Sequence, residues 1–201
     1  MYESASEDDA PLIIYQYFQS WRYFSNMHKE IKWLFQFRED IHKEAAEEID
    51  SIRGGLYISG GKPTLVGIHV RRGDKLTEEM FDFGYRLPNS TCIVQAMDYF
   101  KRRYSDAHFL VISQDMDWCV HHLNNRNIWF PSRQHVAAVD LAMLTLCDHV
   151  IVTEGTFGWW GGFLGGGEVL YYGQPAANGS ELDKMLNETD YFPPEWKPYC
   201  L

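Results

Sequence analysis

Hydrophobic and polar positions alternate along this 201-residue chain in the manner of an α/β protein. Residues 31–52 have helical spacing, with apolar side chains on one side and Glu and Lys on the other. Strands are predicted at 12–18, 64–70, 107–113, 127–130, 148–153 and 168–172, and further helices at 90–104, 116–124, 135–147 and 156–165. This alternating order indicates a Rossmann-like parallel sheet with helices on both faces.

The charged heptad His69 to Lys75 follows the apolar run 65–68 at the end of a predicted buried strand. Its neighbouring arginines, Arg71 and Arg72, each offer a fixed fork of donors that holds two phosphate oxygens at any working pH. In open parallel sheets, ligands bind outside the carboxyl ends of the strands. The heptad therefore predicts a diphosphate site, and a strand that simply ends in solvated charges is the alternative.

The segment 150–167 begins in another predicted strand and continues past its end. Gly155 permits a tight turn, Thr156 is a natural N-cap, and the helix after it points free backbone N–H groups toward the strand end. A membrane span is the alternative for such an apolar segment, but Glu154 and the dense glycines disfavour it. We therefore expect a helix N-terminus that faces a ligand.

A third strand end carries Asp115 and Asp117. An Asp-x-Asp pattern holds a divalent metal in many sugar-nucleotide transferases, but Asp117 fits equally well as a first-turn helical residue favoured by the dipole. Because the arginines already supply positive charge, we prefer Asp115 as a hydrogen-bond acceptor for a guanine edge and expect no metal. His121 and His122 are neighbours on a helix and cannot face one ligand together.

The net charge of -10 and the isoelectric point near 5.2 limit the possible partners. General binders of nucleic acid or of anionic membranes need a basic face, so both classes are disfavoured. Aromatic residues make up 15% of the chain. They suit stacking on a sugar or a nucleobase, although core packing is their commoner use.

Cysteines and glycosylation sequons bear on the compartment. The four cysteines, which show no CxxC spacing, are Cys92, Cys119, Cys147 and Cys200. A zinc site is therefore disfavoured, and the cysteines could form one or two disulfides. Sequons at Asn89, Asn178 and Asn187 are candidate glycosylation sites and favour an oxidising lumen. The acidic N-terminus does not look like a signal segment, so we expect a chain that is cytosolic or lacks its targeting part.

Several ordered segments resemble the galactoside α-1,2-fucosyltransferases, glycosyltransferase family 11. The matching segments are 17–24, 66–74, 140–151, 155–160 and 194–196. The resemblance thus covers nearly the whole chain from about Tyr15 onward, and several motifs in order are more specific than any one of them. Glu154 and Lys75 depart from the vertebrate enzymes, which leaves the acceptor preference open.

The resemblance implies a two-domain fold of the GT-B type, whose second half binds GDP-fucose and whose first half shapes the acceptor site. We expect residues 1–60 to be a remnant of the acceptor-side domain with its connecting helix, and residues 61–201 to be the GDP-fucose-binding domain. The family's N-terminal membrane anchor and most of its first domain are expected to be absent. A Golgi membrane location, on the lumenal face, is implied in the same way.

Residue roles also follow from the resemblance. Arg71 would hold the β-phosphate and neutralise charge on the leaving group without a metal or other cofactor. Arg72 would orient the loop or pair with a carboxylate, and His69 would contact guanine or ribose. Thr156 and Phe157 would donate to the diphosphate. Together with Asp115, these residues form the predicted donor site.

The implied reaction moves L-fucose from GDP-fucose, with inversion, to the 2-hydroxyl of a terminal galactoside on a glycoprotein or glycolipid glycan. Asp74 and Glu154 both lie at strand ends where a carboxylate could take the acceptor proton, and Asp74 ranks first by its motif position. Two alternatives stay open. One is a fucosyltransferase with another acceptor, an N-glycan core or a protein hydroxyl, and the other is a truncated, non-catalytic domain that binds GDP-fucose.

Overall fold

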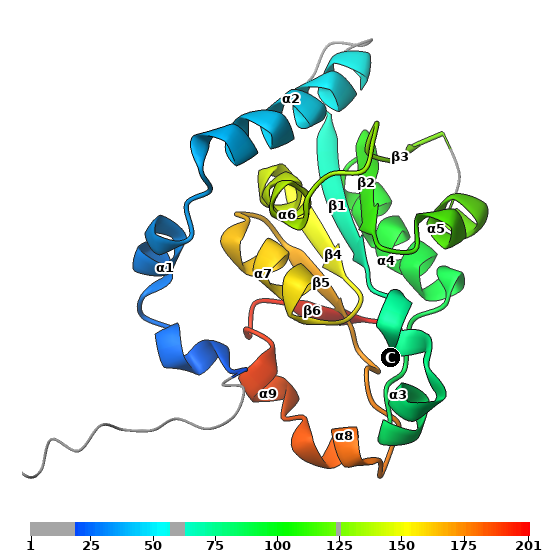
Figure 1. Cartoon of the computed structure of the whole chain (residues 1–201). Helices are drawn as coiled ribbons and strands as arrows, with labels where there is room; N and C mark the ends of the chain where they lie inside the picture. Colours follow the sequence, from blue (N-terminus) through cyan, green and yellow to red (C-terminus); the bar gives the residue numbers. More distant parts are fainter. Residues whose placement is uncertain (1–18, 57–62, 124–125) are drawn as a thin grey trace, which may run out of the picture.

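A six-stranded parallel sheet forms the centre of the protein (Figure 1). The structure, a computed structural model, describes residues 19–56, 63–123 and 126–201. The strands are β1 (Thr64–Val70), β2 (Ala107–Ser113), β3 (Ile128–Trp129), β4 (His149–Val152), β5 (Val169–Tyr172) and β6 (Lys197–Tyr199). Their order across the sheet is β3-β2-β1-β4-β5-β6, and every pairing is parallel. The five strands predicted after residue 63 are confirmed, and the one predicted at 12–18 lies outside the described residues.

Helices connect the strands and cover both faces of the sheet. They are η1 (Trp21–Phe24), α1 (His28–Leu34), α2 (Glu39–Leu56), η2 (Gly73–Leu76), α3 (Glu78–Phe83), α4 (Ser90–Arg103), α5 (Met116–Leu123), α6 (Ala137–Leu146), α7 (Thr156–Leu164), α8 (Glu181–Met185) and α9 (Glu188–Tyr191). On one face α4 and α5 pack on a cluster that includes Val66, and on the other α2 and α6 pack on a cluster that includes Leu65. Successive strand residues point to opposite faces, and all residues of β1 after Thr64 are buried, so this strand packs against both helix layers. The predicted fold class is confirmed.

The single helix predicted at 31–52 is wrong, because the chain forms two helices separated by residues 35–38. Phe35 stacks on Trp160 of α7, with ring centroids 4.6 Å apart, whereas Phe37 packs against the cluster under α2 and α6. The break lets these two nearby aromatic side chains reach different parts of the core. The acidic first turn of α2, Glu39 and Asp40, is the local signal for a new N-terminus.

The last thirty residues form elements that the hydrophobic pattern did not predict, namely α8, α9 and β6. Ser180 and Asn187 cap the two short helices with their side-chain oxygens. A disulfide between Cys92 of α4 and Cys200 ties the end of the chain to the sheet layer. Cys119 and Cys147 are buried free thiols, so one of the two disulfides left open by the sequence is formed among the described residues.

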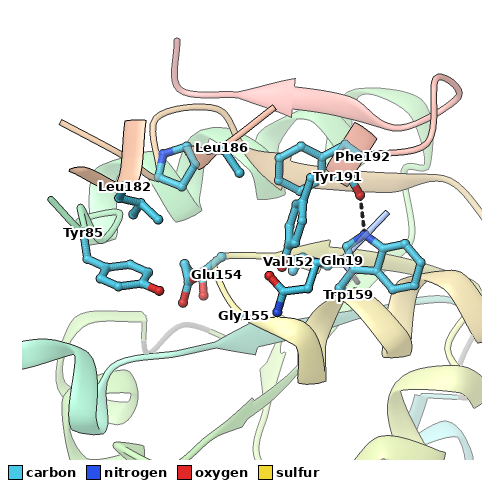
Figure 2. A pocket seen from close by; sticks show the side chains of 12 residues that line it. Gln19, Tyr85, Val152, Glu154, Gly155, Trp159, Leu182, Leu186, Tyr191 and Phe192 are labelled. Atoms are coloured by element: carbon cyan, nitrogen blue, oxygen red, sulfur yellow. Dashed lines mark hydrogen bonds between the residues drawn. The ribbon is translucent and has the colours of Figure 1, made fainter. Parts of the chain in front are cut away.

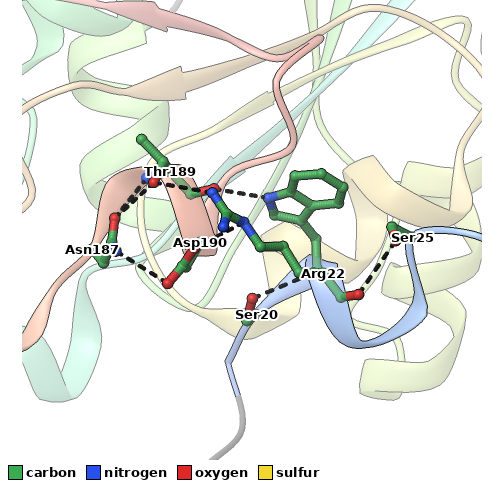
Figure 3. A network of polar contacts seen from close by, with 7 residues as sticks. Ser20, Arg22, Ser25, Asn187, Thr189 and Asp190 are labelled. Atoms are coloured by element: carbon green, nitrogen blue, oxygen red, sulfur yellow. Dashed lines mark hydrogen bonds and ion pairs between the residues drawn. The ribbon is translucent and has the colours of Figure 1, made fainter.

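The segment that contains η1 is bound to α9 (Figure 3). Arg22 Nε lies 2.9 Å from a carboxylate oxygen of Asp190, and the Trp21 indole N–H donates to the carbonyl of Thr189. The Asn187 side chain donates to Asp190, so this predicted glycosylation sequon takes part in the contact. All three sequon asparagines are exposed. The division of the chain near residue 60 stays a prediction, and the residues before it pack directly on those after it.

No helix within the described ranges is both long and apolar enough to cross a bilayer.

A buried ion pair fixes α2 to the start of β4. The Arg53 guanidinium is 7% exposed, lies 3.0 Å from the Asp148 carboxylate and also donates to the carbonyl of Pro63. The same carboxylate accepts the backbone N–H of Leu65 at 2.8 Å. Arg53 and Asp148 therefore connect the helix α2 to the start of β1 and to the residue that precedes β4.

Replacing Arg53 with Ala is expected to lower the free energy of unfolding by about 3 kcal/mol, because it leaves the Asp148 carboxylate without its buried partner. This value is the low end for a broken buried pair, since Asp148 keeps some contact with water. Urea denaturation measures the change. Arg38→Ala, which breaks an exposed pair with Asp40, is the matched control and should cost less than about 1 kcal/mol. Equal losses in both variants would contradict the structural role given to Arg53.

Candidate functional site

The pairing of β1 with β4 brings two distant sequence motifs together. His69 lies opposite Val152 in the register, and the Thr153 backbone N–H donates to the His69 carbonyl at 3.2 Å. One step further on, the Arg71 backbone N–H donates to the Thr153 hydroxyl at 2.8 Å. The heptad and the start of α7 therefore face each other, although more than eighty residues separate them in the sequence.

A cavity of about 190 Å³ opens where these strand ends meet, and we call it the strand-end cavity. Of the residues predicted for donor binding or catalysis, five line it: His69, Arg71, Asp74, Thr156 and Phe157. Its wall is completed by Gln19, Lys75, Tyr85, Glu154, Gly155 and Tyr191. The structure thus gathers most of the predicted site in one place, and it places Arg72 and Asp115 elsewhere.

Arg71 presents its guanidinium to this cavity. The side chain is 25% exposed, and its Nη2 lies 2.8 and 3.0 Å from the two carboxylate oxygens of Asp74. The Nε of Arg71 is buried and has no hydrogen-bond partner within the described residues. Asp74 therefore orients the guanidinium, while one donor of the fork stays available to an anion.

His69 is the neutral member of the site. Its ring is 4% exposed, and burial, aided by the charge of Arg71, lowers the pKa of His69 to about 3. The ring centroid lies 5.1 Å from that of Phe157. Its Nδ1 is buried without a hydrogen-bond partner among the described residues. A neutral imidazole here can exchange a hydrogen bond with an uncharged polar group of a ligand without adding charge.

The helix α7 begins at this cavity, and Gly155 is its N-cap. The prediction that Thr156 is the N-cap is wrong, because the cap position has a φ of +88°, which a side chain rarely allows. Thr156 is instead the first helical residue and keeps its exposed position at the cavity. The first backbone N–H groups of a helix have no intrahelical acceptor, so this end of α7 offers donors and a positive dipole to an anion.

α7 approaches the sheet closely because it has no side chain at Gly158. A Cβ atom built there would lie 2.4 Å from His69 Nδ1 and 2.9 Å from a methyl group of Val152. The absent Cβ therefore sets the distance between the helix N-terminus and the strand ends.

A smaller inner cavity of about 60 Å³ adjoins the strand-end cavity (Figure 2). The two share Gln19, Tyr85, Glu154, Gly155 and Tyr191. Burial raises the pKa of Glu154 above its ordinary value, against the opposing charges of Lys75 and Arg71. The sequence already marked Glu154 as a carboxylate at a strand end, but Tyr85 and Tyr191 carry no local signal and reach the cavity only through tertiary packing.

Arg72 and Asp115 pair with each other at the neighbouring strand end. Arg72 Nε donates to a carboxylate oxygen of Asp115 at 3.1 Å, and the guanidinium lies 4.0 Å from the ring centre of Trp118. The other Asp115 oxygen accepts the backbone N–H of Trp118 at the start of α5. The pairing agrees with the prediction that Arg72 binds a carboxylate. Guanine recognition by Asp115 stays a prediction, and both of its oxygens already have partners.

Asp115 also lines a larger lateral cavity of about 700 Å³, at the ends of β2 and β3. Asp140 of α6 lines the same cavity, and its carboxylate makes no hydrogen bond within the described parts of the chain. Burial raises the pKa of Asp140, whereas the charge of His135 acts in the opposite direction. The sequence did not predict a site role for this residue, and its only local signal is a carboxylate in the first turn of a helix.

Within 19–56, 63–123 and 126–201, no group of three or more His, Cys, Asp or Glu side chains is arranged to hold a metal ion.

The chain as a whole is similar to known proteins of one family. The sequence model described as glycosyl transferase family 11 matches residues 2–199. The chain belongs to glycosyl transferase family 11. Galactoside alpha-(1,2)-fucosyltransferase 1 of Plecturocebus brunneus is 34% identical over 182 residues, which cover 88% of this chain and 49% of that protein. Galactoside 2-alpha-L-fucosyltransferase SEC1 of Bos taurus is 33% identical over 182 residues, or 88% of this chain and 48% of that protein.

This family 11 chain spans about half the length of the curated relatives it matches. Its fold is similar to that of POFUT1 in a crystal structure of the complex with GDP, with a TM-score of 0.53 and 12% sequence identity. That similarity covers 71% of this chain and 50% of the POFUT1 chain. Family membership and the fold class are thus confirmed.

Gly158→Ala is expected to lower the free energy of unfolding by about 1–3 kcal/mol, because the added methyl group must displace His69 or Val152. Chemical denaturation measures the change. Gly54→Ala is the matched control, since Gly54 is also helical and nothing lies within 4 Å of a Cβ there. That variant should be neutral or stabilised by up to about 1 kcal/mol. If Gly158→Ala leaves the free energy of unfolding unchanged, the close approach of α7 to the sheet does not depend on the missing side chain at this position.

Proposed function

We propose that this family 11 protein is an inverting fucosyltransferase that moves L-fucose from GDP-fucose to the 2-hydroxyl of a terminal galactoside. The observation that carries the proposal is the strand-end cavity, where the Arg71 guanidinium, neutral His69 and the N-terminus of α7 meet. Relatives named as galactoside α-1,2-fucosyltransferases support the choice of sugar, linkage and acceptor.

The diphosphate would lie between Arg71 and the start of α7. The Nε of the guanidinium has no hydrogen-bond partner in the described part of the chain, and the helix end adds the N–H groups of Thr156 and Phe157. Negative charge develops on the β-phosphate as the bond to fucose breaks. Fixed donors aimed at that charge stabilise the transition state. We therefore expect the reaction to need no divalent metal.

The guanine base would lie in the lateral cavity. Val70 at the end of β1 and Ser113 at the end of β2 are register partners, and the Ser113 hydroxyl donates to the Val70 carbonyl at 2.8 Å. A nucleotide can therefore pass from one strand end to the next along the same edge of the sheet. Guanine presents two adjacent donors that suit a carboxylate. Among the described residues, the Asp140 oxygens have no hydrogen-bond partner and are available for them, whereas those of Asp115 are occupied.

We also infer that the protein works in the lumen of the Golgi, with its glycan acceptor. The disulfide between Cys92 and Cys200 and the three exposed sequons support an oxidising compartment.

Arg71→Ala is expected to weaken GDP binding about 10- to 100-fold, because it removes charge-assisted hydrogen bonds to the diphosphate. Calorimetric titration in EDTA measures the affinity. Wild-type protein should bind GDP in EDTA as tightly as with Mg²⁺ and should bind ADP more weakly. Arg102→Ala, at an exposed position on α4, is the control and should bind GDP normally.

Transfer of radiolabelled fucose from GDP-fucose to lactose tests the reaction on the same proteins. The proposal expects α-1,2-linked product from wild type and loss of product with Arg71→Ala. A requirement for a divalent ion, or equal affinity for ADP, would contradict the arginine site. GDP binding without transfer to any of the galactoside, N-glycan or protein acceptors would favour a non-catalytic donor domain.

Asp140→Asn should reduce the preference for GDP over ADP about tenfold. The substitution replaces a carboxylate oxygen, which would accept a hydrogen bond from guanine, with an amide NH2 group, which can only donate. Asp115→Asn is the matched comparison. It should weaken the contact with Arg72 and lower stability, yet leave the GDP to ADP ratio unchanged. Titrations of both nucleotides with both variants measure the ratio. If only Asp115→Asn lowers it, guanine recognition belongs to Asp115.

A further inference from the structure

Glu154 occupies the boundary between the strand-end cavity and the inner cavity. It lies two residues after the end of β4, and its side chain lines both spaces. Figure 2 shows the carboxylate between Tyr85 on one side and Tyr191 with Gln19 on the other. Arg71 lines the strand-end cavity as well, so the carboxylate and the guanidinium face one shared volume from two strand ends.

Within the fold, the Glu154 carboxylate interacts with the backbone N–H of Gly155, which lowers its pKa. Its Oε2 is buried and has no hydrogen-bond partner among the described residues. Leaving a buried carboxylate oxygen unpaired costs stability, and such groups concentrate at functional sites. A ligand hydroxyl that donates to this oxygen would satisfy it.

The groups around Glu154 tune its proton affinity. Burial raises the pKa of this carboxyl, the positive charges of Lys75 and Arg71 lower it, and the negative charge of Asp74 raises it. Burial raises the pKa of the Tyr191 phenol, and the nearby negative charge of Glu154 raises it further. Tyr85 lines both cavities beside it. The outcome is a carboxylate with a raised pKa, as a general base near neutral pH requires.

Asp74, the other carboxylate at these strand ends, is placed differently. Both of its oxygens lie within 3.0 Å of the Arg71 guanidinium, and its side chain is 61% exposed. A proton taken up by Asp74 would break the ion pair that orients Arg71. Asp74 therefore suits a role as the positioning residue for Arg71.

The inner cavity provides a surface that fits a sugar edge. Tyr85, Tyr191 and Trp159 contribute aromatic groups, and Leu182 and Leu186 contribute apolar ones. The Trp159 indole N–H donates to the Tyr191 carbonyl at 2.7 Å, which fixes this wall to α7 (Figure 2). One water needs about 10–15 Å³, so 60 Å³ admits only a few such groups, enough for the edge of a sugar ring.

We propose that Glu154 is the catalytic base that accepts the proton of the acceptor hydroxyl. In this step the acceptor oxygen forms a bond to the anomeric carbon of fucose, and the bond from that carbon to the β-phosphate oxygen breaks. The electron pair leaves with GDP beside Arg71, and the acceptor proton moves to Oε2 of Glu154. This inference rests on the proposed function and adds the residue that activates the acceptor.

Glu154→Gln keeps the size of the side chain but cannot take a proton. We expect kcat for fucose transfer to fall at least 100-fold, while the affinity for GDP and the thermal midpoint change little. Glu154→Asp should recover part of kcat. Because the base must be deprotonated, wild-type kcat should fall at low pH, with a midpoint above that of an ordinary glutamate, and this acidic limb should be absent in Glu154→Gln.

Azide separates a base from a structural residue, because it attacks the anomeric carbon without a proton to lose. Wild type and Glu154→Gln should form fucosyl azide at similar rates. Asp74→Asn should instead raise the KM for GDP-fucose through its effect on Arg71. The control is Glu79→Gln, at an exposed position on α3, which should leave that KM unchanged.

Two results overturn the inference in distinguishable ways. If wild type transfers fucose and Glu154→Gln keeps kcat within threefold, Glu154 is not the base and the proposed function stands. If wild type transfers no fucose to any acceptor, both proposals are wrong.

Discussion

The pairing of β1 with β4 is the constraint on which the rest of the site depends. It is the point where the strand order reverses, since β2 lies on one side of β1 and β4 on the other. The hydrogen bonds that join His69, Thr153 and Arg71 continue this pairing past the end of the sheet. A shift of one residue would turn every side chain of β4 to the other face. Arg71 and Glu154 would then no longer share a cavity.

The polar groups at these strand ends are held at a cost to the fold. His69 is buried and Glu154 is partly buried, and each has a buried polar atom with no hydrogen-bond partner among the described residues. Arg71 keeps one exposed ion pair with Asp74, whereas Arg72 is paired, stacked on Trp118 and largely buried. The adjacent arginines therefore differ in kind. Arg72 stabilises the loop, and Arg71 is left with capacity to bind a ligand.

A cluster of large aromatic side chains packs against α7. Trp159, Phe163 and Trp196 form one cluster with β4 and β5, and Phe24 and Phe35 from the N-terminal segment stack on Trp160. Large aromatic surfaces contribute strongly to burial energy. They hold a helix that is short and rich in glycine, and they keep its N-terminus against His69. The apolar segment that suggested a membrane span is therefore explained by packing on the sheet.

The sequence by itself determined the sheet, the order of its elements and the residues at its central strand ends. Apolar runs and their period are local properties, so β1 to β5 were predicted closely, whereas the short β6 was not. The clustering of His69, Arg71, Thr156 and Phe157 was predicted as well. Only the tertiary structure decided which groups pair and which stay unpaired. Asp115 follows a strand and Asp140 lies in the first turn of a helix, yet among the described residues only Asp115 pairs with an arginine. The partner of a polar side chain is often a residue far away in the sequence, and the local sequence pattern does not show which distant residues become neighbours in the fold.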